Sequence, residues 1–282
     1  MPSISLIIPV YNRPLLLLEA LKSVLSQTRL PEEIIVVDDG SGDETVGAAR
    51  DFLEKAEADL NWKLFELDHC GMAGAVRNYG VAASRGEWIA FLDSDDLWEP
   101  EKLARQEAYI LDHPRIRLIH TREKWLRGEK TVSQKKQKHR REGDIFPDAL
   151  NKCIIGPSTV MVRRDLWDET GGFREDLEIA EDYELWLRMT ALEPVGYLDT
   201  PLITKRAGGW DQLSEKYGQI EKFRLEGLAG LVESKWFGDK KIAPARIELA
   251  EAEFRRKCLI YALGCEKRGR LEEGAFWRKR GE

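Results

Sequence analysis

The first hundred residues alternate short apolar runs with helical patterns, and this alternation constrains the fold more than any other feature of the sequence. Four runs have the composition or the two-residue period of β-strands: Ile4–Val10, Ile34–Val37, Trp62–Leu67 and Trp88–Leu92. Three segments between them are expected to be helical: 15–27, about 45–56 and 73–84. Repeated strand–helix units predict an α/β fold with a mostly parallel central sheet and flanking helices. Ligands of such sheets bind at the carboxyl ends of the strands.

The remainder of the chain is less regular. Residues 122–141 hold nine Lys or Arg against two Glu, which predicts an exposed ribbon or loop. Ser158–Val162 has the composition of another strand, and Tyr183–Leu192 has the pattern of a helix. Residues 213–282 are rich in Glu, Lys, Arg, Ala and Leu and are expected to be helical. We therefore predict an α/β domain over residues 1–212, divided near residue 100, followed by a C-terminal helical extension over 213–282.

The composition excludes several classes of protein. A formal net charge of −6 argues against general nucleic-acid binding, which usually needs an excess of Lys and Arg. The amino terminus has no secretory pattern, and no apolar run approaches the roughly 18 residues that span a bilayer. The four cysteines form no Cys-x-x-Cys pair, so a disulfide framework or zinc site is not expected. These features together predict a cytoplasmic protein.

An acidic turn, Asp38-Asp39-Gly40-Ser41, follows the second expected strand. A carboxylate there can accept hydrogen bonds from a nucleobase imide or a ribose hydroxyl, and Gly40 allows a tight turn beside a ligand. An Asp in this place can equally cap the following helix. The local pattern does not separate these two interpretations.

A second acidic cluster, Asp93-Ser94-Asp95-Asp96, follows the strand that ends at Leu92. Carboxylates two residues apart in an extended segment project to the same side and can share a hard cation such as Mg²⁺ or Mn²⁺. Such a cation would relieve the repulsion between the acids and hold a diphosphate. Capping of the helix expected near Pro100 needs only one acid, so we favour the metal and leave Asp96 as a helix cap.

Other charged residues allow two interpretations each. Arg77 can pair with a phosphate or with the acidic cluster, or be an exposed helical residue. Glu181 and Asp182 open a helix, where acids complement the helix dipole, but one of them can also be a general base. The basic segment 135–141 is a solvated loop or a contact for anionic lipid head groups. His69 and His120 are expected to be polar surface.

Five motifs taken together resemble glycosyltransferase family 2. They occur in the order and rough spacing of that family between about Ser3 and Ser214: Pro9-Val10-Tyr11-Asn12, Asp38-Asp39-Gly40-Ser41, Ala75-Val76-Arg77-Asn78, Leu92-Asp93-Ser94-Asp95-Asp96 and Glu181-Asp182. The resemblance implies the GT-A fold, in which residues 1–100 bind the nucleotide sugar and residues 101–212 bind the acceptor. It also implies an inverting transfer from a nucleotide-diphosphate sugar, with UDP as the default, to a saccharide or glycolipid.

The resemblance also implies roles for individual residues. Asp182 is the base that deprotonates the acceptor hydroxyl, and Asp95, with Asp93, holds Mn²⁺ or Mg²⁺. Gly171-Gly172-Phe173 and Gly156-Pro157-Ser158 resemble the turns that line the sugar and acceptor side, and Glu181 is a further candidate site residue. The residues implied in nucleotide-sugar binding are Pro9, Val10, Tyr11, Asn12, Asp39, Arg77, Asp93 and Ser94.

The sequence departs from the family at one place. Many relatives carry a His where Trp210 stands, and that His can hold metal or diphosphate. In place of that His, Lys205 or Arg206 is expected to supply the positive charge that neutralises the diphosphate. The chain has no Gln-x-x-Arg-Trp motif, which is found in processive polysaccharide synthases, and no membrane span. Addition of one sugar is therefore expected rather than polymerisation. The expected role is bacterial surface glycan or glycolipid assembly, at the inner face of the membrane. The alternatives are a non-catalytic nucleotide-sugar-binding or regulatory module, or a nucleotidyltransferase; Pro9–Pro14 lacks the glycines of the latter's phosphate loop.

Overall fold

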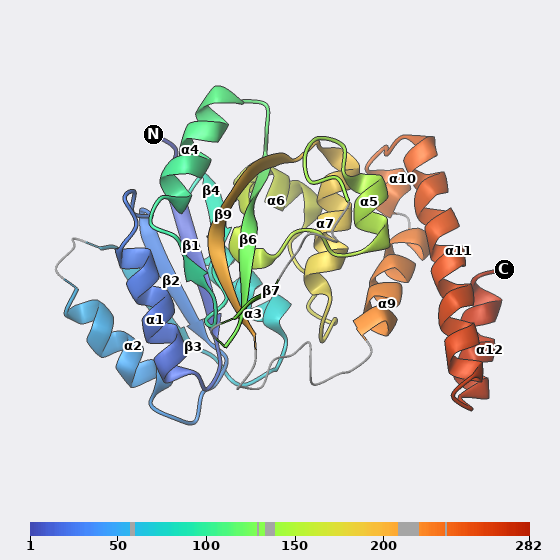
Figure 1. Ribbon diagram of the computed structural model, residues 1–282, viewed down its shortest axis with the longest axis horizontal. Helices are drawn as coiled ribbons and strands as arrows, with labels where there is room; N and C mark the ends of the chain where they lie inside the picture. The colour runs from blue at the N-terminus through green and yellow to red at the C-terminus, as the bar shows by residue number, and fades with distance from the viewer. Residues whose placement is uncertain (57–59, 129, 133–138, 208–219, 235) are drawn as a thin grey trace.

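The computed structural model describes residues 1–56, 60–128, 130–132, 139–207, 220–234 and 236–282. Its centre is a mixed sheet whose strands lie in the order β3-β2-β1-β4-β8-β6-β9-β5, with β7 paired to β6 (Figure 1). The strands are β1 Ile4–Val10, β2 Glu33–Asp38, β3 Trp62–Glu66, β4 Trp88–Phe91, β5 Leu97–Trp98, β6 Leu118–Arg127, β7 Lys130–Val132, β8 Met161–Arg163 and β9 Gly196–Ala207.

The helices cover both faces of this sheet, and the C-terminal ones lie beyond the helical layer on one face (Figure 1). They are α1 Pro14–Leu25, α2 Thr45–Glu54, α3 Ala73–Ala82, α4 Lys102–Asp112, α5 Phe146–Asn151, α6 Arg164–Thr170, α7 Glu181–Leu192, α9 Ile220–Glu233, α10 Trp236–Asp239, α11 Pro244–Glu266 and α12 Leu271–Arg280, with the 3-10 turn η1 Pro157–Thr159. None of the helices described here is both long enough and apolar enough to cross a membrane.

Strand β1 shows how the sequence specifies the layers. Its side chains alternate, so Leu6 and Ile8 join the core under α1, α2 and α4, while Ile7 joins the core under α3, α6 and α7. The parallel pairs β3-β2, β2-β1 and β1-β4 confirm the predicted strand–helix units. Beyond β4 the pairing becomes mixed, because β8 runs antiparallel to both β4 and β6.

A third core joins the C-terminal helices to α5 and α7, and the helical extension is confirmed for the part of it that the structure describes. Tyr183 and Leu187 of α7 pack there with Leu228 of α9 and Phe254 of α11. The expected boundary at residues 212–213 lies outside the described residues, so the division into domains stays a prediction.

Two local predictions were wrong. The strand expected at Ser158–Val162 begins only at Met161, because Pro157 opens a 3-10 turn in which the Thr159 amide donates to Gly156 O at 2.9 Å. Asp96 does not cap a helix, since α4 begins at Lys102 and has no side-chain cap. Of the ribbon or loop expected over residues 122–141, the described residues 125–127 and 130–132 pair as β6 and β7, whereas residues 129 and 133–138 lie outside the described residues.

Candidate active site

The carboxyl ends of β1, β2 and β4 meet at one edge of the sheet and carry the predicted motifs to one place. The Asp39 amide donates to Val10 O at 2.9 Å, which ties the end of β2 to the end of β1. Pro9 and Val10 belong to β1 itself, and Val10 is buried in the core. Asp93 follows β4 directly.

The Asp38–Ser41 turn is organised by its carboxylates. Asp38 accepts from the Ser41 amide at 2.8 Å, and Asp39 accepts from the Cys70 and Gly71 amides, each at 2.9 Å. Gly40 has φ +73°, and a Cβ there would lie 2.6 Å from the His69 backbone nitrogen. Helix α2 has no side-chain cap, so the capping interpretation of this turn was wrong.

Tyr11 and Asn12 lie beside that turn. Asn12 has φ +47°; its backbone amide donates to Ser41 Oγ at 2.8 Å, and its Oδ1 accepts from the Gly42 amide at 2.9 Å. The Tyr11 ring stacks on His69 with centroids 4.0 Å apart, and His69 Nδ1 lies 2.9 Å from Asp39 Oδ2. The sequence analysis predicts His69 only as polar surface and does not predict its contact with Asp39. Its position a few residues before Ala75-Val76-Arg77-Asn78 is the one sequence feature that could have indicated a place in the site.

Arg77 joins the two acidic motifs. The guanidinium is buried and donates to Asp93 Oδ1 and to Glu181 Oε1, both at 2.6 Å. Burial opposes the charge on Asp93, but Arg77, Lys205 and Arg13 together lower the pKa of its carboxyl. Burial raises the pKa of Glu181 to about 7, although Arg77 acts in the opposite direction. Of the interpretations left open for Arg77, the structure favours pairing with the acidic cluster.

The other two acids of the cluster also have partners within the protein. Asp95 pairs with Arg13 Nη1 at 3.0 Å, and the Asp95 carbonyl accepts from Arg206 Nε at 2.7 Å. Asp96 accepts from Ser158 Oγ at 2.6 Å, and burial raises the pKa of its carboxyl to about 8. Ser94, between Asp93 and Asp95, is buried. The expectation that a metal alone relieves the repulsion in this cluster was therefore wrong.

Lys205 stands among these acids, as expected for a substitute charge. Burial alone would lower the pKa of its ammonium, yet Asp96, Glu123, Asp93 and Asp182 hold that pKa well above its ordinary value. Trp210 lies outside the described residues.

The donor atoms of the cluster fit a hard divalent cation only as part of a shared site. Within the described ranges no three His, Cys, Asp or Glu side chains form a metal-binding group. The carboxylates of Asp93 and Asp95 are oxygen donors of the kind that Mg²⁺ and Mn²⁺ prefer. Sites for Mg²⁺ often use one or two carboxylates and complete the shell with substrate phosphates and water. Asp93 and Asp95 therefore fit a site in which substrate phosphates and water complete the coordination shell.

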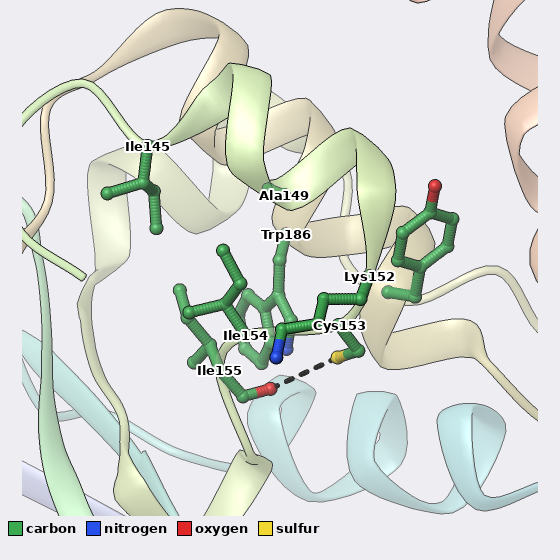
Figure 2. A pocket seen from close by; sticks show the side chains of 8 residues that line it. Ile145, Ala149, Lys152, Cys153, Ile154, Ile155 and Trp186 are labelled. Carbon is green, nitrogen blue, oxygen red and sulfur yellow. Dashed lines mark hydrogen bonds between the residues drawn. The ribbon is translucent and has the colours of Figure 1, made fainter. Parts of the chain in front are cut away.

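Asp182 lies at the first turn of α7, which begins at Glu181 as predicted. Its Oδ1 accepts from the Tyr183 amide at 2.6 Å, and its Oδ2 lies 3.4 Å from Cys153 Sγ. Cys153 and Tyr183 line a narrow pocket with Lys152, Ile154 and Trp186 (Figure 2). The predicted base therefore contacts Cys153, one of the residues that line this pocket.

Gly172 forms part of the turn before α7. Its φ is +73°, and a Cβ there would lie 2.9 Å from Asn78 Oδ1, so the close approach to α3 requires glycine. Asn78 Nδ2 also donates to Phe173 O at 2.8 Å, and Arg188 Nη2 donates to Gly172 O at 2.6 Å. These bonds fix the turn between the Arg77 helix and the Asp182 helix.

Comparisons with known proteins agree with this geometry. The chain matches the family model described as glycosyl transferase family 2 over residues 5–171. A Rickettsia conorii protein described as an uncharacterized glycosyltransferase is 33% identical over 212 residues, covering 73% of this chain and 33% of that protein. The O-antigen biosynthesis protein RfbC of Myxococcus xanthus is 31% identical over 211 residues, covering 73% of this chain and 16% of that protein. This chain thus spans one third or less of the length of either relative.

Solved structures share the fold at lower identity. S. aureus TarS in complex with UDP-GlcNAc superposes with a TM-score of 0.68 at 20% identity, covering 98% of this chain and 90% of that chain. The mannosyltransferase PcManGT from Pyrobaculum calidifontis, in complex with GDP-Man and Mn²⁺, has a TM-score of 0.63 at 18% identity, covering 98% of this chain and 85% of that one. The fold of this chain is that of the GT-A enzymes, and the chain belongs to glycosyltransferase family 2.

Proposed function

We propose that this chain is an inverting glycosyltransferase that moves one sugar from a nucleotide-diphosphate donor to an acceptor hydroxyl. The observation that carries the proposal is the pair of bonds from Arg77 to Asp93 and to Glu181, which brings the acidic cluster after β4 close to the start of α7, where Asp182 lies. A binding module needs the acidic cluster, whereas a general base at the start of α7 is needed only for transfer.

The nucleoside is assigned to the edge formed by β1 and β2. Asp39 is buried and already accepts two backbone amides, and a carboxylate offers about four acceptor positions in all, so it can still receive a base imide. The exposed rings of Tyr11 and His69 lie on the same side. UDP is our first choice, supported by the UDP-GlcNAc in the TarS structure; the GDP-Man in the PcManGT structure is the second.

The diphosphate is assigned to the Asp93–Asp95 end of β4, where Asp95 and Asp93 would hold Mn²⁺ or Mg²⁺. Such a cation supplies positive charge for the leaving nucleoside diphosphate. The PcManGT structure, which contains Mn²⁺, supports this assignment. Arg13, Lys205 and Arg206 stand beside these acids and add cationic charge on the protein side.

Asp182 is assigned as the base. It takes the proton of the acceptor hydroxyl while that oxygen attacks the anomeric carbon from the face opposite the diphosphate, so one displacement inverts the configuration. The acceptor is a saccharide or glycolipid, and RfbC supports a role in surface glycan assembly. A location at the cytoplasmic membrane surface, with the basic segment 135–141 as the contact, belongs to the same proposal; residues 135–138 of that segment lie outside the described residues.

A nucleotide panel tests the proposal most directly. Thermal shifts are measured with UDP, TDP, GDP and CMP, each with and without Mn²⁺, and hydrolysis of the matching nucleotide sugar is then followed. We expect one diphosphate to stabilise the chain more in the presence of Mn²⁺, and slow hydrolysis of its sugar. Stabilisation without any hydrolysis or transfer would favour the non-catalytic binding module instead.

A further inference from the structure

A thiol lies against the proposed base. Cys153 follows α5, is half-buried, and its Sγ lies 3.4 Å from Asp182 Oδ2 and 3.3 Å from the Ile155 carbonyl oxygen. Figure 2 shows the second contact as a dashed line across the pocket. A thiol has one proton, so it can donate to only one of these two acceptors at a time.

The surroundings keep this thiol protonated. Burial first, and the charge of Asp182 second, raise the pKa of Cys153 well above its ordinary value. A protonated thiol is a weak hydrogen-bond donor and a poor nucleophile or metal ligand. The chemistry open to Cys153 is therefore donation to one of its two oxygen neighbours.

The two contacts of Asp182 fix the orientation of its carboxylate. The Tyr183 amide holds Oδ1 at 2.6 Å, and the thiol faces Oδ2. Two of the carboxylate's roughly four acceptor positions are thereby used, and the others remain for an acceptor hydroxyl. Without Cys153, only the Tyr183 amide would restrain the carboxylate among the hydrogen bonds seen here.

We propose that Cys153 is a positioning residue of the transfer reaction: its thiol orients the Asp182 carboxylate and passes its hydrogen bond to the Ile155 carbonyl once Asp182 has taken up a proton. The inference rests on the proposed function, because it needs Asp182 to be the base. It assigns to Cys153 no contact with donor or acceptor.

The proton balance of the step is complete without an added reagent. The acceptor oxygen forms a bond to the anomeric carbon, and its proton moves to Asp182. The bond from the anomeric carbon to the diphosphate breaks, and its electron pair leaves with the nucleoside diphosphate. The thiol keeps its own proton throughout; only the direction in which it donates changes, from Asp182 Oδ2 to Ile155 O.

Other charges also act on this pair. Glu181 precedes Asp182 in α7, and Arg224 from α9 and Lys205 from β9 act on the Cys153 thiol together with Asp182. Substitution of Cys153 by Ser or Ala leaves all four of these charged groups in place. A change in the pH profile of such variants therefore reports the thiol itself.

The test compares Cys153→Ser and Cys153→Ala with the wild type in the full chain. The kcat, KM and pH profile of donor hydrolysis are measured with UDP-GlcNAc, or with GDP-mannose if GDP is the stabilising nucleotide. Cys265→Ala is the control, because Cys265 is a buried thiol in the C-terminal core.

We expect Cys153→Ala to lower kcat by roughly tenfold with KM within twofold, since misplacement of a base affects the transition state more than donor binding. Cys153→Ser should keep at least half of kcat and move the acid limb of the profile to lower pH, because a hydroxyl donates more strongly to a carboxylate. A Cys153→Ala enzyme with wild-type kcat and profile would overturn the inference. So would equal losses in both variants with unchanged profiles, which indicate packing alone.

A second measurement needs no activity. Alkylation of Cys153 by iodoacetamide, followed by peptide mass mapping, should be faster in Asp182→Asn than in the wild type, since the negative charge that opposes thiolate formation is gone. Equal rates would show that the contact does not form in solution and would overturn the inference. Activity of Asp182→Asn would instead overturn the proposed function, whereas an inactive Asp182→Asn beside an unaffected Cys153→Ala overturns only the role of Cys153.

Discussion

Arg77 donates to Asp93 at 2.6 Å and, with its other terminal nitrogen, to Glu181 at the same distance. Asp93 follows β4 in the proposed donor half, and Glu181 precedes the proposed base on α7. One buried guanidinium therefore links the segment after β4 to the start of α7, which carries the proposed base. The pairing also explains how the fold accommodates both Asp93 and Glu181, because each carboxyl group bonds to the same Arg77 guanidinium.

Replacement of Arg77 by Met tests this connection. Removal of one partner from a buried ionic network leaves uncompensated charge, at a cost of about 3–5 kcal/mol. We expect a loss of that order in the free energy of urea unfolding at pH 7.5, and a smaller loss at pH 5, where Glu181 with its raised pKa of about 7 is protonated. Arg50→Met is the control, since Arg50 forms an exposed pair with Glu66. Equal losses in both variants would contradict the role of Arg77.

Replacement of Asp182 by Asn separates chemistry from binding. The amide keeps the size and the Tyr183 contact of the side chain but cannot take up the acceptor's proton. We expect transfer and donor hydrolysis to fall at least a hundredfold, while the thermal shift with nucleotide and Mn²⁺ stays within experimental error. Asp176→Asn, whose exposed carboxylate pairs with Arg174, is the control. Retained turnover in Asp182→Asn would remove Asp182 from the role of base.

The parts predicted from the sequence are those in which local patterns and tertiary structure agree. Buried apolar runs predict β1, β2 and β4, and the acidic residues after β2 and β4 lie at the expected edge. Sequence reasoning missed contacts that depend on pairing across the fold. Ser158 meets Asp96 only because Pro157 replaces the expected strand by a 3-10 turn, and Arg13 reaches Asp95 from a different loop. No periodicity within either segment encodes such contacts.

Asp95→Asn tests the proposed cation site. The substitution keeps the shape of the side chain and removes the charge that a hard cation requires. By calorimetry, we expect Mn²⁺ to tighten the binding of the selected nucleoside diphosphate at least tenfold in the wild type and not at all in the variant. Affinity without metal should change little or rise, because the substitution removes a negative charge beside the proposed diphosphate site. An unchanged effect of Mn²⁺ would exclude Asp95 from the site.

His120 gives the fold a pH dependence that is separate from catalysis. The ring is fully enclosed, contacts Tyr197, and places Nε2 2.8 Å from Arg141 O. Burial, with the charge of Arg141 adding to it, lowers the pKa of His120 from 6.5 to about 4. The unfolded chain therefore binds a proton at a pH where the folded chain does not. Stability from this group is complete above pH 6.5 and is lost as the pH falls toward 4, by about 3 kcal/mol.

The measurement is the free energy of urea unfolding between pH 7.5 and 4.5 for the wild type and for His120→Gln. Glutamine can still donate to the Arg141 carbonyl but does not titrate, so its curve should fall less steeply below pH 6.5, and the two curves should converge as the pH drops. Carboxylates remote from His120 act equally on both proteins and cancel in the difference. His113→Gln is the control, because His113 is exposed and bonds its Nδ1 to Tyr109 O within its own helix end. Parallel curves for wild type and His120→Gln would show that His120 is not held neutral by the fold.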